Sequence, residues 1–303
     1  MFKTSVALMI ASLLLSLIVA AEAGSGFRRV QKLLDLSGLA WMGDDIFLVV
    51  HDAKFPDERS RVRVSLLKLP SSLQGILWKP LRPRFPGGKS NDLESASRIP
   101  GTQMVLLVES ADDASDFERI FLAERIRNRV KVLGALDWRS FTNVFNVEGT
   151  AVAETDDGYV FLWAERADGD PNTVIKWTDL TLQPFAIGSS GVISSVLFPL
   201  LDDVYTRPLV AMDVDDTGQI YIATAFDPDS DNGPYRSAVF KIGHVLDGAV
   251  VLDPEPALQA TMDGLKVESV AVRSHEGETE LFVGTDDENY GGTLRLLPKV
   301  DSE

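Results

Sequence analysis

The segment Asn146-Val-Glu148-Gly-Thr-Ala-Val-Ala153 is followed by an acidic turn, Asp156-Asp-Gly158, and then by Tyr159-Val-Phe-Leu-Trp-Ala-Glu165. Both apolar runs are short and rich in β-branched or aromatic residues, which is typical of strands buried on both faces. The alternative, a pair of short buried helices, is disfavoured because helices need longer runs. The segment therefore predicts two antiparallel strands with a carboxylate, Glu148 or Glu165, at each outer end.

Four further copies of this unit occur along the chain, at spacings of roughly 55–60 residues. They begin at Leu36, Asp92, Leu209 and Lys266, and their second strands end near Asp52, Glu109, Thr224 and Asp286. Repeated units that bury their faces only against neighbours form one continuous structure. The sequence therefore predicts an all-β fold, a five-bladed β-propeller, as a single domain over residues 24–298.

The ends of this domain predict how the ring closes. The last repeat supplies an inner pair and a third strand that ends at Pro298, but no fourth strand. The segment from Phe27 to Leu34 precedes the first repeat and has no blade of its own. We therefore expect the N-terminal strand to pair with the last blade and close the ring. Residues 299–303 are expected to fray, and an extra loop or short helix is expected within 191–201.

Residues 1–23 have the pattern of a secretory signal peptide. Lys3 provides a positive start, Val6–Ala20 is an apolar run, and Ala21-Glu-Ala23 fits a cleavage site. The run is shorter than the ~20 residues that span a bilayer, although an uncleaved anchor is the alternative. We expect an exported protein, periplasmic or extracellular, with no membrane span after signal cleavage.

The composition excludes several classes of function. The chain of 303 residues has no Cys, which excludes a thiol nucleophile, thiolate metal ligands and a disulfide-stapled fold. Its net charge of −16 repels phosphate backbones, so nucleic acid is not expected as a partner. The charge favours cations and basic partners, or serves solubility alone. We expect a monomer whose partner is a small molecule or a protein.

One segment departs from this acidic character. Leu77–Ser90 contains four basic residues, three prolines and two glycines, which is typical of a loop or an irregular edge strand. Its positive charge indicates either a contact for an anion or a partner, or an exposed edge protected by Lys and Arg.

The acidic residues of the repeats are expected to converge. Strands alternate in direction within a blade, so the start of the first strand and the end of the second lie on one face of the disc. Glu94, Glu148 and Glu268 stand at the starts of first strands. At or near the ends of second strands stand His51, Asp52, Glu109, Glu165, Asp227, Asp286 and Asp287. Both groups are therefore expected at one mouth of the central channel.

Gathered carboxylates raise one another's pKa unless a cation neutralises them. We therefore predict a divalent-cation site, with Ca²⁺ as the metal, Glu94, Glu148 and Glu268 as ligands and the second group around them. Acidic loops at 112–116, 168–172 and 227–233 support a preference for hard cations. The alternative is that the three glutamates accept backbone N–H bonds and lock the blades together.

No sequence motif identifies a catalytic nucleophile. Gly188-Ser-Ser-Gly191 is not a nucleophile elbow. His51, His244 and His275 show no metal-ligand spacing. His51 beside Asp52 fits either a general base with its partner or a structural histidine.

The units Leu36-Ser-Gly-Leu-Ala40, Asp92-Leu-Glu94, Asn146-Val-Glu148-Gly149 and Val267-Glu268-Ser269 resemble those of bacterial secreted β-propellers of the phytase-like and esterase-like families. The resemblance covers most of the chain after residue 23 and implies the propeller fold. The phytases have six blades and several Ca²⁺ ions, so five repeats depart from their pattern.

Two functions follow from this resemblance and from the carboxylates. One is a non-catalytic propeller that binds a cation, a small ligand or a partner, which the lack of a nucleophile favours. The other is a Ca²⁺-dependent phosphoester or ester hydrolase, with metal-bound water and Glu109, Glu165 or His51 as base.

Overall fold

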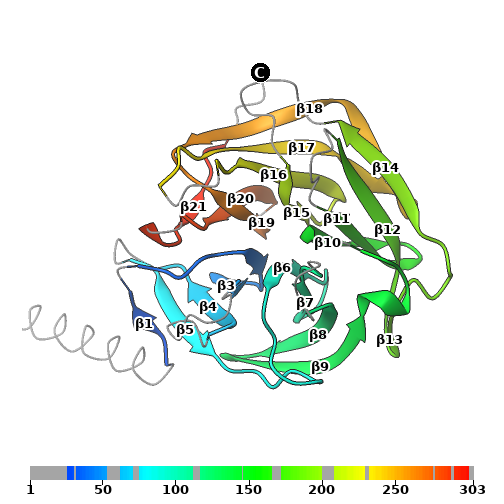
Figure 1. Ribbon diagram of the computed structural model, residues 1–303, viewed down its shortest axis with the longest axis horizontal. Coiled ribbons are helices and arrows are strands. Elements are labelled where there is room, and N and C mark those ends of the chain that lie inside the picture. Colours follow the sequence, from blue (N-terminus) through cyan, green and yellow to red (C-terminus); the bar gives the residue numbers. More distant parts are fainter. Residues whose placement is uncertain are drawn as a thin grey trace, which may run out of the picture.

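The computed structural model describes residues 26–30, 32–52, 62–70, 75–111, 117–144, 146–165, 172–199, 208–228, 232–275, 277–287 and 290–299. Five antiparallel sheets surround a central axis, so the predicted five-bladed β-propeller is confirmed (Figure 1). The expected signal segment 1–23, the tail beyond residue 299 and the loops at 112–116 and 168–171 lie outside these residues. Within the described ranges, no helix has the length and apolarity needed to cross a membrane.

Each blade follows one stretch of the chain. Blade 1 contains β2 (Gly38–Trp41), β3 (Ile46–Val50), β4 (Val64–Lys68) and β5 (Leu77–Leu81), with β1 (Arg28–Arg29) added at its edge. Blade 2 contains β6 (Leu93–Arg98), β7 (Met104–Glu109), β8 (Arg119–Ile126) and β9 (Arg129–Asp137), followed by the short 3₁₀ helix η1 (Trp138–Ser140). Blade 3 contains β10 (Val147–Thr155), β11 (Gly158–Glu165), β12 (Asn172–Leu182), β13 (Phe185–Ile187) and β14 (Ser194–Pro199). Blade 4 contains β15 (Leu209–Val214), β16 (Gln219–Phe226), β17 (Arg236–Leu246) and β18 (Ala249–Asp263). Blade 5 contains β19 (Val267–His275), β20 (Glu278–Thr285) and β21 (Leu294–Leu296).

The hydrophobic core is divided into five clusters, and each lies between two neighbouring blades. This arrangement explains the continuous apolar runs in the sequence, because an inner strand covered on both faces has no polar side. The inner strands β2, β6, β10, β15 and β19 contact one another in that order, and β19 contacts β2. At this seam Phe47 packs on Phe282 with ring centroids 4.7 Å apart.

The expected closure of the ring by the N-terminal strand is not what the structure shows. β1 pairs with β5 of blade 1, with Arg28 opposite Trp78. Phe27 is buried in the core between blades 1 and 2, which fixes the strand on that side. Between the described N-terminal residues and blade 5, an isolated bridge joins Leu33 to Gly292. Blade 5 has three described strands, as the sequence predicted.

The expected loop or short helix within 191–201 is wrong for residues 194–199, whereas residues 200 and 201 lie outside the described ranges. Residues Ser194–Pro199 form the strand β14, which pairs with the first half of β12. Phe198 is buried in the core between blades 3 and 4 and anchors this strand. The segment is therefore a strand of the sheet, because pairing with β12 places the Phe198 side chain in the core.

Candidate metal centre

β-Bulges at the starts of the inner strands set the direction of the three candidate glutamates. The pairing of β6 with β7 skips Glu94, that of β10 with β11 skips Glu148, and that of β19 with β20 skips Glu268. The extra residue of a bulge bends the strand and re-aims its side chain, often beside a functional site. β15 has the same irregularity at Val210. The bulge thus recurs in blades 2 to 5. Its extra residue is a glutamate in blades 2, 3 and 5 and a valine in blade 4, so only three of the four bulges carry a carboxylate.

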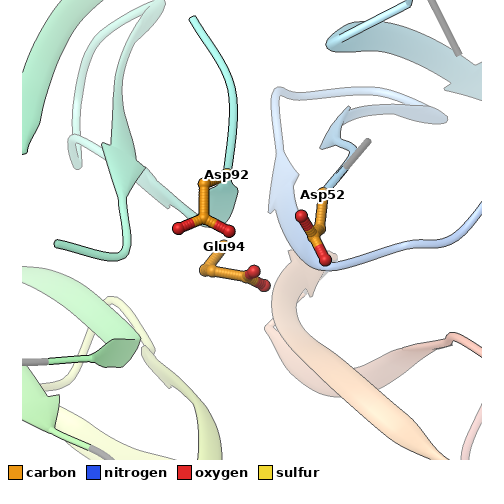
Figure 2. A group of neighbouring side chains, drawn as sticks. All are labelled: Asp52, Asp92 and Glu94. Atoms are coloured by element: carbon orange, nitrogen blue, oxygen red, sulfur yellow. The ribbon is translucent and has the colours of Figure 1, made fainter. Parts of the chain in front are cut away.

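The residue two positions before the glutamate has a left-handed backbone in two blades. Asp92 has φ of 57° and Asn146 has φ of 49°. Asp and Asn occupy this region more readily than other residues with a side chain. The turn at Asp92 brings its carboxylate to the same side as that of Glu94 (Figure 2).

Asp52, Asp92 and Glu94 form the acidic cluster of the structure. Each offers a carboxylate oxygen, and these oxygens lie within 4.8 Å of one another. Asp52 follows β3 of blade 1, whereas Asp92 and Glu94 belong to the start of β6 in blade 2. Figure 2 shows the Glu94 carboxylate directed across the gap between the two blades toward Asp52.

The donor set of this cluster fits a hard cation. Ca²⁺ binds oxygen at 2.3–2.6 Å, so two ligands of one Ca²⁺ can be up to about 5 Å apart; Mg²⁺, at 2.0–2.1 Å, allows about 4 Å. Three carboxylates without nitrogen or sulfur donors match the oxygen preference of both ions. Oxygens that all lie within 4.8 Å of one another are therefore compatible with one Ca²⁺ ion.

Neighbouring side chains hold the cluster in place. Arg63 of blade 1 donates to the Ser90 carbonyl at 3.0 Å and to Asn91 Oδ1 at 2.7 Å, which ties the segment before Asp92 to blade 1. Burial lowers the pKa of Arg63, and the charges of Asp52 and Asp35 oppose that shift. The hydroxyl of Ser110 donates to Asp92 Oδ2. The cluster thus lies in a braced junction between two blades.

The other two predicted ligands lie at the axis of the ring. Glu148 and Glu268 line a small axial cavity, partly open to solvent, to which the inner strands of all five blades contribute; its volume of about 10 Å³ is roughly enough for one water molecule. Glu268 pairs with Lys266 at 3.3 Å, and Lys266 also pairs with Asp227 at 2.9 Å. The structure therefore groups Glu94 with two aspartates, and gathers Glu148 and Glu268 around the axis.

Two acidic residues at the ends of second strands, Glu109 and Glu165, pair within their own blades. Glu109 is fully buried, and its two carboxylate oxygens accept hydrogen bonds from the Arg119 backbone and guanidinium and from Ser90 at 2.7–2.9 Å. Burial raises the pKa of Glu109, and these hydrogen bonds oppose the rise. Glu165 forms the same type of pair with Lys176 of the third strand. These two carboxylates hold strands together.

Asp286 and Asp287 fix the start of β19. Asp287 is buried, and it accepts hydrogen bonds from the Lys266 backbone at 3.0 Å and from the Thr285 hydroxyl at 2.7 Å. The Asp286 backbone N–H donates to the Lys266 carbonyl at 3.0 Å. The sequence-based alternative to metal binding is that the three glutamates accept backbone N–H bonds. Asp287 has this role at the start of β19.

His51 has a structural environment. It is 1% exposed; its Nδ1 lies 2.5 Å from the Asp35 carbonyl and its Nε2 lies 2.9 Å from the Ser65 hydroxyl. Because a carbonyl can only accept, Nδ1 carries the proton and Nε2 accepts from Ser65. Burial lowers the pKa of His51, partly offset by Asp35. Both nitrogens are engaged, which supports the structural interpretation over a general base.

A buried acid on β15 predicts a specific pH dependence. Asp213 accepts backbone hydrogen bonds from Val272 of blade 5 at 2.7 Å and from Val214 at 2.9 Å. Burial raises the pKa of Asp213 from 3.8 to about 6, against the effect of these bonds and of Arg98. Between about pH 4 and pH 6 the folded protein therefore keeps a proton that the unfolded chain releases. The free energy of unfolding should consequently fall as pH rises through this window, by about 3 kcal/mol from this group.

Urea unfolding at pH 4, 5, 6 and 7 measures this effect. In Asp213→Asn the amide is neutral throughout, so its stability relative to wild type should rise with pH across the window. Asp157→Asn, in an exposed turn, is the control and should track wild type. A constant difference between Asp213→Asn and wild type at all four pH values would contradict the assignment.

Comparison with known proteins identifies the fold. No protein-family model and no curated protein matches the sequence. Among solved structures, a thermostable family-43 glycoside hydrolase is similar with a TM-score of 0.56 and 12% identity, over 91% of this chain and 94% of that one. An exo-1,5-α-L-arabinanase from a bovine ruminal metagenomic library has a TM-score of 0.52 and 10% identity, over 89% and 94%. Such low identity shows a shared β-propeller fold and no more.

Proposed function

We propose that this chain is an exported binding propeller that holds a divalent cation, Ca²⁺, at the junction of blades 1 and 2. The observation that carries the proposal is the convergence of Asp52, Asp92 and Glu94 within 4.8 Å. Three negative charges at this separation repel one another unless a cation or protons neutralise them. A cation would also join the two blades, because its ligands come from both.

The cation would serve to recruit a ligand. Ca²⁺ takes six to eight oxygen ligands, so three carboxylates leave positions for water or for oxygens of a bound molecule. A small molecule with carboxylate, phosphate or vicinal hydroxyl groups fits these positions, as does an acidic side chain of a partner protein. The cavity lined by Glu148 and Glu268 on the axis offers such a ligand additional polar contacts.

Calorimetric titration with Ca²⁺ tests the proposal. Asp92→Asn and Glu94→Gln should each weaken Ca²⁺ binding at least tenfold, because each removes a charged ligand. Glu255→Gln is the matched control, since it removes an equal charge from an exposed position on β18 of blade 4 and should leave the affinity within about twofold. Ca²⁺ at a hundredfold excess over Kd should stabilise the wild type by about 2.7 kcal/mol. Absence of heat and of any thermal shift with Ca²⁺, Mg²⁺ and Mn²⁺ would overturn the proposal.

A second candidate function is hydrolysis of an ester, phosphoester or glycoside. The observation in its favour is that Glu148, which is 5% exposed, and Glu268 line one opening that reaches solvent. Two carboxylates at one opening can divide the roles of general acid and general base. The sequence resemblance to phytase-like propellers and the shared fold with two glycoside-cleaving enzymes suggest these substrate classes.

Nitrophenyl phosphate, acetate and arabinofuranoside substrates, assayed with and without Ca²⁺, separate the two candidates. Turnover that is lost in Glu148→Gln while the melting temperature stays the same would favour the enzyme. Ca²⁺ binding without turnover of any of these substrates would favour the binding propeller.

A further inference from the structure

The charge of the chain is divided unevenly between its blades. Residues 26–142, which include blades 1 and 2, carry 19 Lys and Arg against 15 Asp and Glu. Residues 143–303, which include blades 3 to 5, carry 9 against 29. The net charge of −16 therefore comes from one side of the disc, and the other side is mildly positive. Charge asymmetry of this kind is typical of proteins that contact a charged surface.

The positive charge of blade 1 is concentrated at its outer edge. Pairing of β1 with β5 places Arg28 opposite Trp78 and Arg29 opposite Leu77, and the loop of residues 82–91 follows β5. Residues 26–34 and 76–91 contain no Asp or Glu. Figure 1 shows these two strands at the rim of the disc. This surface, here called the basic rim, has six basic residues, and all but Lys79 are exposed: Arg28, Arg29, Lys79, Arg82, Arg84 and Lys89.

Contacts beneath the charges give the basic rim a fixed shape. The Arg28 guanidinium lies 4.7 Å from the centroid of the Trp78 ring. The guanidinium of Arg119, which is held by Glu109, donates to the Pro86 carbonyl at 3.0 Å and to the Lys89 carbonyl at 2.7 Å. The loop after β5 is therefore tied to blade 2, and its basic side chains stand on an ordered backbone.

The chemistry that the basic rim offers is almost purely electrostatic. It has three aromatic residues: Phe27 and Trp78 are buried at 8% and 7% exposure, and Phe85 is partly buried and packs on Phe121 of blade 2, with ring centroids 4.8 Å apart. Stable protein interfaces depend on aromatic or aliphatic anchors at their centre. None of the aromatic side chains of the basic rim is exposed, so none of them offers such an anchor. A surface of four to eight Lys and Arg without such anchors suits anionic lipid headgroups, which need only charge.

We propose that the basic rim docks this propeller edge-on against a membrane surface rich in anionic lipid headgroups. Each basic residue near such a surface contributes about 1 kcal/mol, and salt weakens the attraction. The acidic blades 3 and 4 lie across the disc from β1 and β5 (Figure 1), so they stay away from the lipid. Edge-on docking also leaves both faces of the disc, and hence the acidic cluster, open to solution.

Vesicle co-sedimentation of the purified full chain tests this proposal. Vesicles of phosphatidylcholine alone are compared with vesicles containing about a third phosphatidylglycerol, at 0.1 and 0.5 M NaCl. We expect at least tenfold stronger partition onto the anionic vesicles at low salt, and loss of this preference at high salt. Lys3 and the apolar run Val6–Ala20 are common to the wild type and to the variants described next, so the comparison between these proteins isolates the basic rim.

Two triple variants with equal charge locate the surface. Arg82→Gln/Arg84→Gln/Lys89→Gln should lower the anionic preference about tenfold or more, whereas Lys241→Gln/Arg295→Gln/Lys299→Gln should leave it within about twofold. Equal losses in the two variants, no preference in wild type, or binding to soluble heparin without binding to vesicles would each overturn the proposal.

Discussion

Alanine at position 38 is expected to destabilise the propeller by about 3 kcal/mol or more, the upper range for overpacking of a core. Gly38 lies on β2 where blade 1 approaches blade 2. A Cβ atom there would lie 2.5 Å from Val50 Cγ2, 2.6 Å from the Ala96 nitrogen and 2.7 Å from the Ser95 carbonyl carbon. Two of these atoms belong to the backbone of β6 and cannot turn away. The two inner strands would have to separate.

Thermal and urea unfolding measure this effect, with Gly134→Ala as the control. Gly134 is also in a strand, but its nearest neighbour is the Phe185 side chain at 3.3 Å, which can shift. We expect Gly38→Ala to lower the melting temperature by roughly 5–10 °C and Gly134→Ala to change it little. Gly38→Ala should also weaken Ca²⁺ binding, because Ser95 adjoins Glu94. A Gly38→Ala protein as stable as wild type would contradict the close approach of these strands.

Replacement of Glu109 by alanine is expected to destabilise the protein by about 3–5 kcal/mol, the usual effect of breaking a buried ion pair. Glu109 is fully buried, and the side chain of its partner Arg119 is 16% exposed. The variant leaves a largely buried guanidinium without its counter-charge. The double variant Glu109→Leu/Arg119→Leu should recover much of the loss, because it removes both charges.

Urea unfolding of Glu109→Leu, Arg119→Leu and the double variant Glu109→Leu/Arg119→Leu gives the coupling energy of the pair. Glu165→Gln is the control, since the side chains of Glu165 and Lys176 are 23% and 24% exposed and solvent screens them. That variant should lose less than about 1 kcal/mol. Equal losses for Glu109→Ala and Glu165→Gln would show that burial does not distinguish the two pairs.

The repeats predicted the fold because each carries its own information. The inner hairpins are apolar on both faces and have a glycine in the turn between their two strands, so their number gives the number of blades. The place of β1 could not be predicted, because a strand of two residues has no pattern that selects an edge. Burial of Phe27 between blades 1 and 2 selects it, and that depends on tertiary packing.

The candidate site was predicted in part. Placing the ends of second strands and the starts of first strands on one face brought Asp52 and Glu94 together, and the structure adds Asp92 to them. The sequence Asp92-Leu-Glu94 shows two carboxylates at the entry to one strand, but regular alternation does not bring them together. The left-handed backbone at Asp92 and the bulge at Glu94 do so, and these are local features of the folded backbone. Pairs such as Glu109 with Arg119 could not be foreseen, since they depend on the register between β7 and β8. Cation binding by Glu148 and Glu268 stays a prediction.

Because each apolar cluster is shared by two blades, no blade is a unit that could fold or be inherited alone. A fragment lacking one blade would present two uncovered apolar sheets, and two such fragments would cover each other more readily than either would remain in solution. A change in the number of blades therefore has to add or remove one whole repeat. All the other blades must then also change the angle at which they pack on their neighbours.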